Sequence, residues 1–80
     1  MIYYPYMRSN QDETTIREIA AKLREYRLMK NLKQSDLAEK AGLNSNYYAK
    51  VERGEATPSV VTLRRILEAL GIKSSKILPF

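Results

Sequence analysis

The sequence predicts an all-α fold of five short helices that follow an N-terminal arm. Apolar residues recur at steps of three and four along several segments, which is the spacing of a helix with one buried face. Gly42, Gly54 and Gly71 each follow such a segment, and glycine readily adopts the conformation that ends a helix. The 80 residues suffice for one small domain, which we expect to span residues 14–80 behind an arm of residues 1–13.

The first predicted helix runs from residue 14 to about residue 30. Thr15 followed by Glu18 has the pattern of a capping box, in which each side chain satisfies a free backbone N–H of the other residue. The apolar residues of this segment keep helical spacing and predict its inward face: Ile16, Ile19, Ala20 and Leu23.

Two shorter predicted helices follow, over residues 34–41 and from residue 45 to about residue 53. Gly42 ends the first, and either Asn44 or Ser45 is suited to cap the second. Two short helices joined by a glycine-containing turn have the proportions of a helix-turn-helix unit, here residues 34–54.

The remaining helical segments lie near the C-terminus. Ser59 is predicted to cap a helix that ends at Gly71, and Ser74 and Ser75 can cap one last turn over residues 76–78. Helical spacing predicts the inward residues of the longer segment: Val60, Leu63, Ile66, Leu67 and Leu70.

Composition excludes several classes of function. The chain has no cysteine and no histidine, so we expect no metal site, no cofactor and no enzymatic activity. It has neither an apolar run long enough for a membrane span nor the pattern of a signal peptide, so we expect a soluble cytoplasmic protein. The net charge of +5 suits a polyanionic partner, although many soluble domains carry such a surplus.

The segment 45–53 separates into two faces on a helical wheel, because neighbouring helical residues point about 100° apart. Tyr48 and Val51 lie inward with Glu52 beside them, while Tyr47 lies on the flank. The opposite face is small, polar and basic, as suits a helix in a major groove, although any solvated helix has such a face. Its residues are Asn46, Ala49, Lys50 and Arg53.

The stretch LKQSDLAEKAGLNSNYYAKVERGEATPSVVTLRRILEALGI closely resembles the phage-repressor type of helix-turn-helix domain, the Cro-like or XRE family. The resemblance implies a five-helix, lambda-repressor-like fold and a sequence-specific, DNA-binding transcriptional regulator. Small stand-alone regulators such as phage repressors and restriction–modification controller proteins are similar in kind. The positions that carry the match are Gln34, Leu37, Ala38, Gly42, Tyr48, Val51, Glu52, Gly54, Pro58, Leu63, Ile66, Leu70 and Gly71.

The family resemblance also implies roles for individual residues. The positions expected to read bases are Ser45, Asn46, Tyr47, Ala49 and Lys50, and those expected to contact phosphates are Gln34, Lys33, Asn44 and Arg53. Arg27 and Glu52 match a structural ion pair. Two positions depart from the pattern. Lys33 replaces the usual Ser or Thr cap, and Tyr47 is bulkier than usual, so that packing beside Val51 and contact with DNA are both open to it.

The resemblance implies a homodimer on double-stranded DNA. The apolar C-terminal tail must pack on its own core or on a partner, which favours a dimer through the fourth and fifth helices and this tail. Twofold symmetry then predicts a palindromic operator. The resemblance further implies a repressor or autoregulator. The alternative is an antitoxin or adaptor whose main partner is another protein, bound through residues 1–8.

Overall fold

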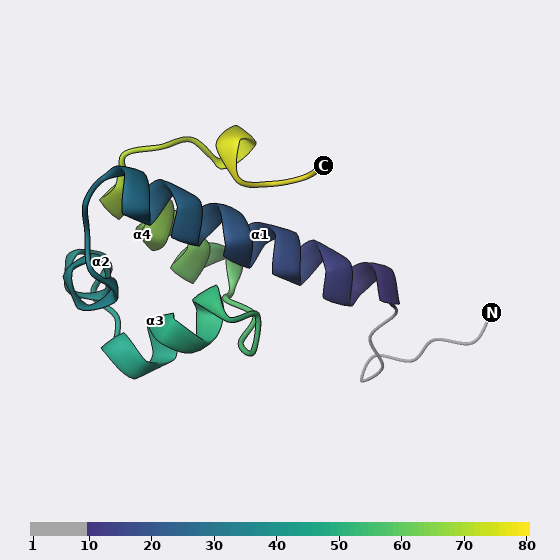
Figure 1. Cartoon of the computed structure of the whole chain (residues 1–80), viewed down its shortest axis with the longest axis horizontal. Coiled ribbons are helices and arrows are strands. Elements are labelled where there is room, and N and C mark those ends of the chain that lie inside the picture. The colour runs from purple at the N-terminus through teal and green to yellow at the C-terminus, as the bar shows by residue number, and fades with distance from the viewer. Residues whose placement is uncertain (1–9) are drawn as a thin grey trace.

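A computed structural model describes residues 10–80 and shows four α-helices and one short 3-10 helix (Figure 1). The elements are α1 (Asn10–Met29), α2 (Gln34–Ala41), α3 (Ser45–Glu52), α4 (Val60–Leu70) and η1 (Ser74–Lys76). The described residues contain no strand, which confirms the all-α class. The predicted fifth helix was wrong in kind and position, because a single 3-10 turn begins two residues earlier than the expected turn.

The start of α1 differs from the prediction. The helix begins at Asn10, so residues 10–13 belong to it and not to an arm. Asp12 and Glu13 lie in its first turn, where negative charge is favourable near the exposed backbone N–H groups. Thr15 does not cap the helix, since its hydroxyl donates to the carbonyl of Gln11 at 2.9 Å, within the helix. The rest of the predicted arm lies outside the described residues.

The helices surround one apolar core. In Figure 1, α1 crosses the molecule, with α3 on one side and the C-terminal segment on the other. Helix α2 packs against both α3 and α4, and α1 packs against α3. The C-terminal segment contributes to the core through Ile77, which is 2% exposed. The buried cluster is formed by Leu23, Leu37, Ala38, Ala41, Tyr48, Val51, Ile66, Leu67, Leu70 and Ile77.

The prediction for Val60 was wrong. Ser59 caps α4 as expected, because its hydroxyl accepts from the backbone N–H of Thr62 at 3.1 Å. Val60 is the first residue of α4, however, and is 85% exposed. Helical spacing places Val60 on the face of Leu63, but no part of residues 10–80 covers that face at the helix end. Among the described residues, no helix is both long enough and apolar enough to cross a membrane.

Candidate nucleic-acid interface

The α2–turn–α3 unit has the predicted geometry. Both helices contain eight residues, and Gly42 ends α2 in the left-handed conformation with φ of 70°. That conformation strains residues with a Cβ, which explains the glycine. The backbone N–H of Leu43 donates to the carbonyl of Ala38 at 2.8 Å and closes the turn. The chain is thereby redirected over three residues, and α3 is held against α2.

Asn44 fixes the start of α3. Its side-chain oxygen accepts from the backbone N–H groups of Asn46 at 2.8 Å and Tyr47 at 3.2 Å. Two of the N–H groups that a helix leaves unpaired at its start are satisfied in this way. The sequence left Asn44 and Ser45 as alternative caps, and the structure selects Asn44. The amide nitrogen of Asn44 keeps its two donors for another acceptor.

The outer face of α3, defined as Ser45, Asn46, Ala49, Lys50 and Arg53, is directed away from the core. Ala49 is half-buried and the other four are exposed. The opposite side carries Tyr48 at 0% exposure and Val51 at 2%. The structure therefore brings five of the predicted contact residues together on one side of α3, and the opposite side of that helix is buried in the core.

The two adjacent tyrosines have different environments. Tyr47 is half-buried and packs against the core cluster, in agreement with packing on the flank of α3. Tyr48 is fully buried, and its hydroxyl has no hydrogen-bond partner among residues 10–80. Burial and, secondarily, the negative charge of nearby Glu52 raise the pKa of Tyr48 above its ordinary value of 10.0. The hydroxyl of Tyr48 therefore stays protonated in the folded state far into the alkaline range.

Arg53, at the end of the outer face, pairs with Glu55. Its Nε–H donates to a carboxylate oxygen of Glu55, and both side chains are more than half exposed. The hydrogen bond from Arg53 lowers the pKa of Glu55, and the same bond raises that of Arg53. The terminal nitrogens of Arg53 stay available to a further acceptor, because the contact with Glu55 uses Nε.

The other predicted phosphate contacts lie at the start of α2. Lys33 is exposed and Gln34, the first residue of α2, is half-buried. A lysine side chain has no acceptor and cannot cap a helix. The backbone N–H of Lys33 instead donates to the carboxylate of Asp36 at 2.9 Å. The structure thus restores half of a capping box through Asp36, three residues into α2, a residue that the sequence analysis missed.

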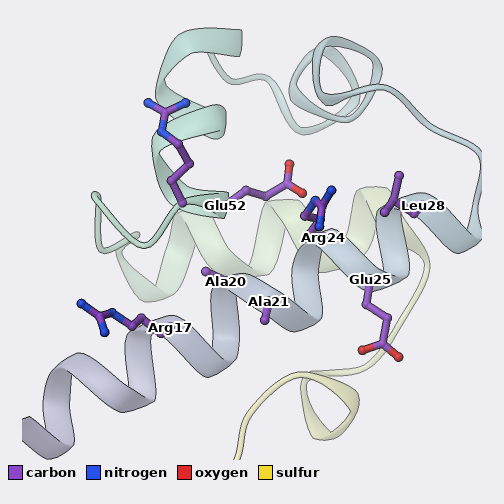
Figure 2. Close-up of a pocket in the computed structure, with 8 residues that line it drawn as sticks. Arg17, Ala20, Ala21, Arg24, Glu25, Leu28 and Glu52 are labelled. Carbon is purple, nitrogen blue, oxygen red and sulfur yellow. The ribbon is translucent and has the colours of Figure 1, made fainter.

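An open hollow lies between α1 and the end of α3 (Figure 2). Arg17 and Arg24 border it from α1, and Arg53 borders it from the end of α3. Gly54 approaches α1 so closely that a Cβ there would lie 3.6 Å from Cγ of Arg17. Arg17 and Arg24 were not among the contact residues predicted from the sequence, although a separation of seven residues places them on one face of a helix.

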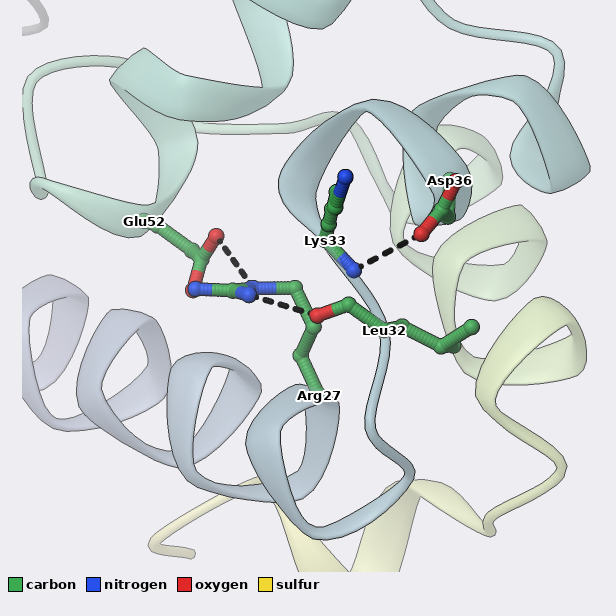
Figure 3. A network of polar contacts seen from close by, with 5 residues as sticks. All are labelled: Arg27, Leu32, Lys33, Asp36 and Glu52. Atoms are coloured by element: carbon green, nitrogen blue, oxygen red, sulfur yellow. Dashed lines mark hydrogen bonds and ion pairs between the residues drawn. The ribbon is translucent and has the colours of Figure 1, made fainter.

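A buried ion pair holds α1 to α3 (Figure 3). Nε of Arg27 lies 3.0 Å from both carboxylate oxygens of Glu52, and the side chains are 9% and 1% exposed. A second donor, Nη1 of Arg27, reaches the carbonyl of Leu32 at 2.7 Å. The geometry agrees with the pair expected from the sequence. It also shows a contact that the sequence did not indicate, to the segment between α1 and α2.

The sequence matches the model of a known protein family. The family model described as Helix-turn-helix matches residues 23–77, which is more than half of the chain. This chain belongs to the helix-turn-helix family. As a member, it is 41% identical over 64 residues to the control protein C.SmaI of Serratia marcescens, an alignment that covers 79% of this chain and 76% of the relative.

Two further proteins similar to this helix-turn-helix protein are regulators by name. It is 39% identical over 59 residues to the immunity repressor protein of Bacillus phage phi105, which covers 74% of this chain and 41% of that repressor. The crystal structure of the restriction-modification controller protein C.AhdI from Aeromonas hydrophila superposes with a TM-score of 0.79 at 32% identity, covering 81% of this chain and 98% of the other. This agrees with the Cro-like or XRE resemblance of the sequence.

Proposed function

We propose that this chain is a sequence-specific transcriptional regulator that binds double-stranded DNA and lays α3 in the major groove. The observation that carries the proposal is the contrast between the two sides of α3. One side is fixed in the core by Tyr48, Val51 and Glu52, while the outer face is small, polar and basic. A rigid helix with such a face is suited to reading base edges.

The residues of the interface divide by chemistry. An asparagine amide pairs bidentately with adenine, and a lysine reaches guanine, so Asn46 and Lys50 carry the strongest base readout. Ser45 and Ala49 allow close approach of α3, and Tyr47 touches the groove from the flank. The residues proposed to hold phosphates are Lys33, Gln34, Asn44 and Arg53, which fix the register of α3 without reading sequence.

The proposed regulator acts as a homodimer through α4, η1 and the C-terminal tail. Val60, Val61 and Phe80 are 85%, 55% and 86% exposed, and such apolar surface is suited to burial against a second copy. Twofold symmetry gives a palindromic operator with half-site centres about 34 Å apart. We infer repression or autoregulation, in keeping with the names of an immunity repressor and a control protein among the relatives.

The outer face of α3 makes a prediction about base and phosphate contacts. Asn46→Ala and Lys50→Ala should each cost roughly 1–3 kcal/mol on the preferred operator and relax specificity at one position. Arg53→Ala should weaken binding to all sequences and reduce the salt slope by about 0.9. Operators are first selected from random duplexes, and fluorescence anisotropy at several salt concentrations then measures each affinity.

Lys40→Ala provides the control, because Lys40 is exposed on α2 and is not one of the proposed contacts. Its affinity and its salt slope should remain those of the wild type. The proposal fails if the wild type selects no sequence from the random pool. It also fails if Asn46→Ala and Lys50→Ala leave the selected sequence unchanged.

A further inference from the structure

The hollow between α1 and the end of α3 concentrates positive charge beside the proposed DNA surface. Three arginines border it: Arg17 and Arg24 from α1, and Arg53 from the end of α3. Within residues 10–80, neither Arg17 nor Arg24 has an ion-pair partner, and both are exposed. Two guanidinium groups without an ion-pair partner therefore border the same hollow as Arg53.

The acidic residues at this hollow are already engaged elsewhere. The carboxylate of Glu52 is buried and bound by Arg27. Glu25 also lines the hollow, but it pairs with Lys22 at 3.5 Å, and its carboxylate points away from the end of α3 in Figure 2. The hollow is therefore cationic, and it suits an anionic partner.

The floor of the hollow permits a close approach. Ala20 and Ala21 lie on α1 between the two arginines, so no large side chain fills the space (Figure 2). The stem of Arg17 passes Gly54, which directly follows Arg53 in the chain. Arg17 and Arg24 are separated by seven residues, or about 10.5 Å along a helix, so they present a row of charge and not a point.

We infer that Arg17 and Arg24 hold the phosphate backbone of the operator next to the contact of Arg53. A guanidinium binds a phosphate bidentately, and DNA carries its phosphates in a continuous row. The inference rests on the proposed function and extends its contact surface from α3 onto α1. Arg17 lies before residue 23, where the family match begins, so that match does not supply this contact.

The test compares Arg17→Ala, Arg24→Ala and the double variant with the wild type by fluorescence anisotropy on the selected operator over a series of salt concentrations. Each single change should reduce the slope of log K against log salt by about 0.9, and the double change by about 1.8. At about 0.15 M salt, each change should weaken binding roughly 5-fold, and equally on operator and unrelated duplexes.

Lys40→Ala is the control. It likewise removes one positive charge from an exposed helical position, but Lys40 borders the groove beside Arg65 and Glu68 of α4 and not this hollow. Its slope and its affinity should equal those of the wild type. Alanine favours a helix at all three positions, and thermal unfolding of each variant confirms that the fold is kept.

Ethylation interference locates the contact on the DNA. Phosphates whose ethylation blocks wild-type binding but no longer affects the double variant should lie beside those lost with Arg53→Ala. Slopes equal to the wild type in both arginine variants, or a loss as large in Lys40→Ala, would overturn the inference while the proposed function stands. Absence of DNA binding by the wild type would remove both together.

Discussion

Tyr48 shows how a single side chain can stabilise the fold and carry an unfavourable group at once. Its ring is fully buried in the core, but its hydroxyl donates to no acceptor within the described residues. A buried hydroxyl without a partner costs about 1–3 kcal/mol relative to one in water. The ring therefore holds α3 in place, while the oxygen opposes folding.

Tyr48→Phe should accordingly leave stability unchanged or raise it by up to about 1 kcal/mol at neutral pH. The raised pKa also predicts a difference in alkali. The folded state keeps the Tyr48 proton to a higher pH than the unfolded state does. Ionisation of Tyr48 therefore leaves the free energy of unfolding unchanged below pH 10. Above pH 10 the unfolded state releases the proton first, and the free energy of unfolding falls by about 1.4 kcal/mol per pH unit. Urea unfolding at several alkaline pH values measures both effects.

Tyr48→Phe should lose less stability than the wild type above about pH 10, since the phenylalanine has no proton to release. The other tyrosines are present in both proteins, so their contributions to the pH dependence of stability cancel in the comparison. Tyr48→Ala is the companion variant and should cost about 3 kcal/mol or more at any pH, because the ring is lost. Parallel alkaline curves for the wild type and Tyr48→Phe would contradict this account of Tyr48.

At the scale of the element, the start of α3 depends on one cap. Asn44→Ala should destabilise the protein by about 1 kcal/mol, because two backbone N–H groups lose their acceptor. Asn44→Asp keeps the acceptor and should retain stability, yet it should weaken DNA binding by adding negative charge at a proposed phosphate contact. Thermal unfolding and anisotropy separate the two roles. Equal melting temperatures for Asn44→Ala and the wild type would exclude the cap.

The helical elements could be predicted from the sequence wherever a local signal was unique. Gly42 and Gly71 end α2 and α4 as expected, because both adopt the left-handed conformation that favours glycine. The start of α1 was missed because Thr15 fits two patterns, a cap and a bond back to the preceding turn. Asp36 was missed because its role requires knowing that Lys33 precedes the helix in an extended conformation.

The candidate site was predictable in its direction but not in its extent. Tyr48 and Val51 are buried, and their positions on the helical wheel fix which residues of α3 face outward. The position of Arg17 next to Arg53 depends on how α1 crosses the end of α3, which is a tertiary contact without a local sequence pattern. The prediction that Val60 is buried was wrong for the same reason. Helical spacing shows which residues share a face, but it does not show whether another element covers that face.

At the scale of the whole molecule, the exposed apolar start of α4 predicts the state of assembly. Val60→Asp should convert the proposed dimer into a monomer, because it places a charge in the apolar interface. The fold should be kept, since an acidic residue is favourable in the first turn of a helix. Sedimentation velocity measures the mass, and Lys40→Asp serves as a control with a charge change on α2. A wild type that sediments as a monomer at high concentration would contradict the dimer.

The guanidinium of Arg27 has a consequence for any attempt to transplant the DNA-reading unit. It joins three parts of the chain, namely α1, the carbonyl of Leu32 before α2, and Glu52 at the end of α3. A fragment of residues 34–54 would lack Arg27 and the side chains of α1 and α4 that bury Tyr48 and Val51, so it would lose both the ion pair and the core that hold α3. The smallest DNA-reading unit that can be transplanted therefore includes α1. DNA specificity should be altered by exchanging side chains of the outer face of α3 within the intact domain.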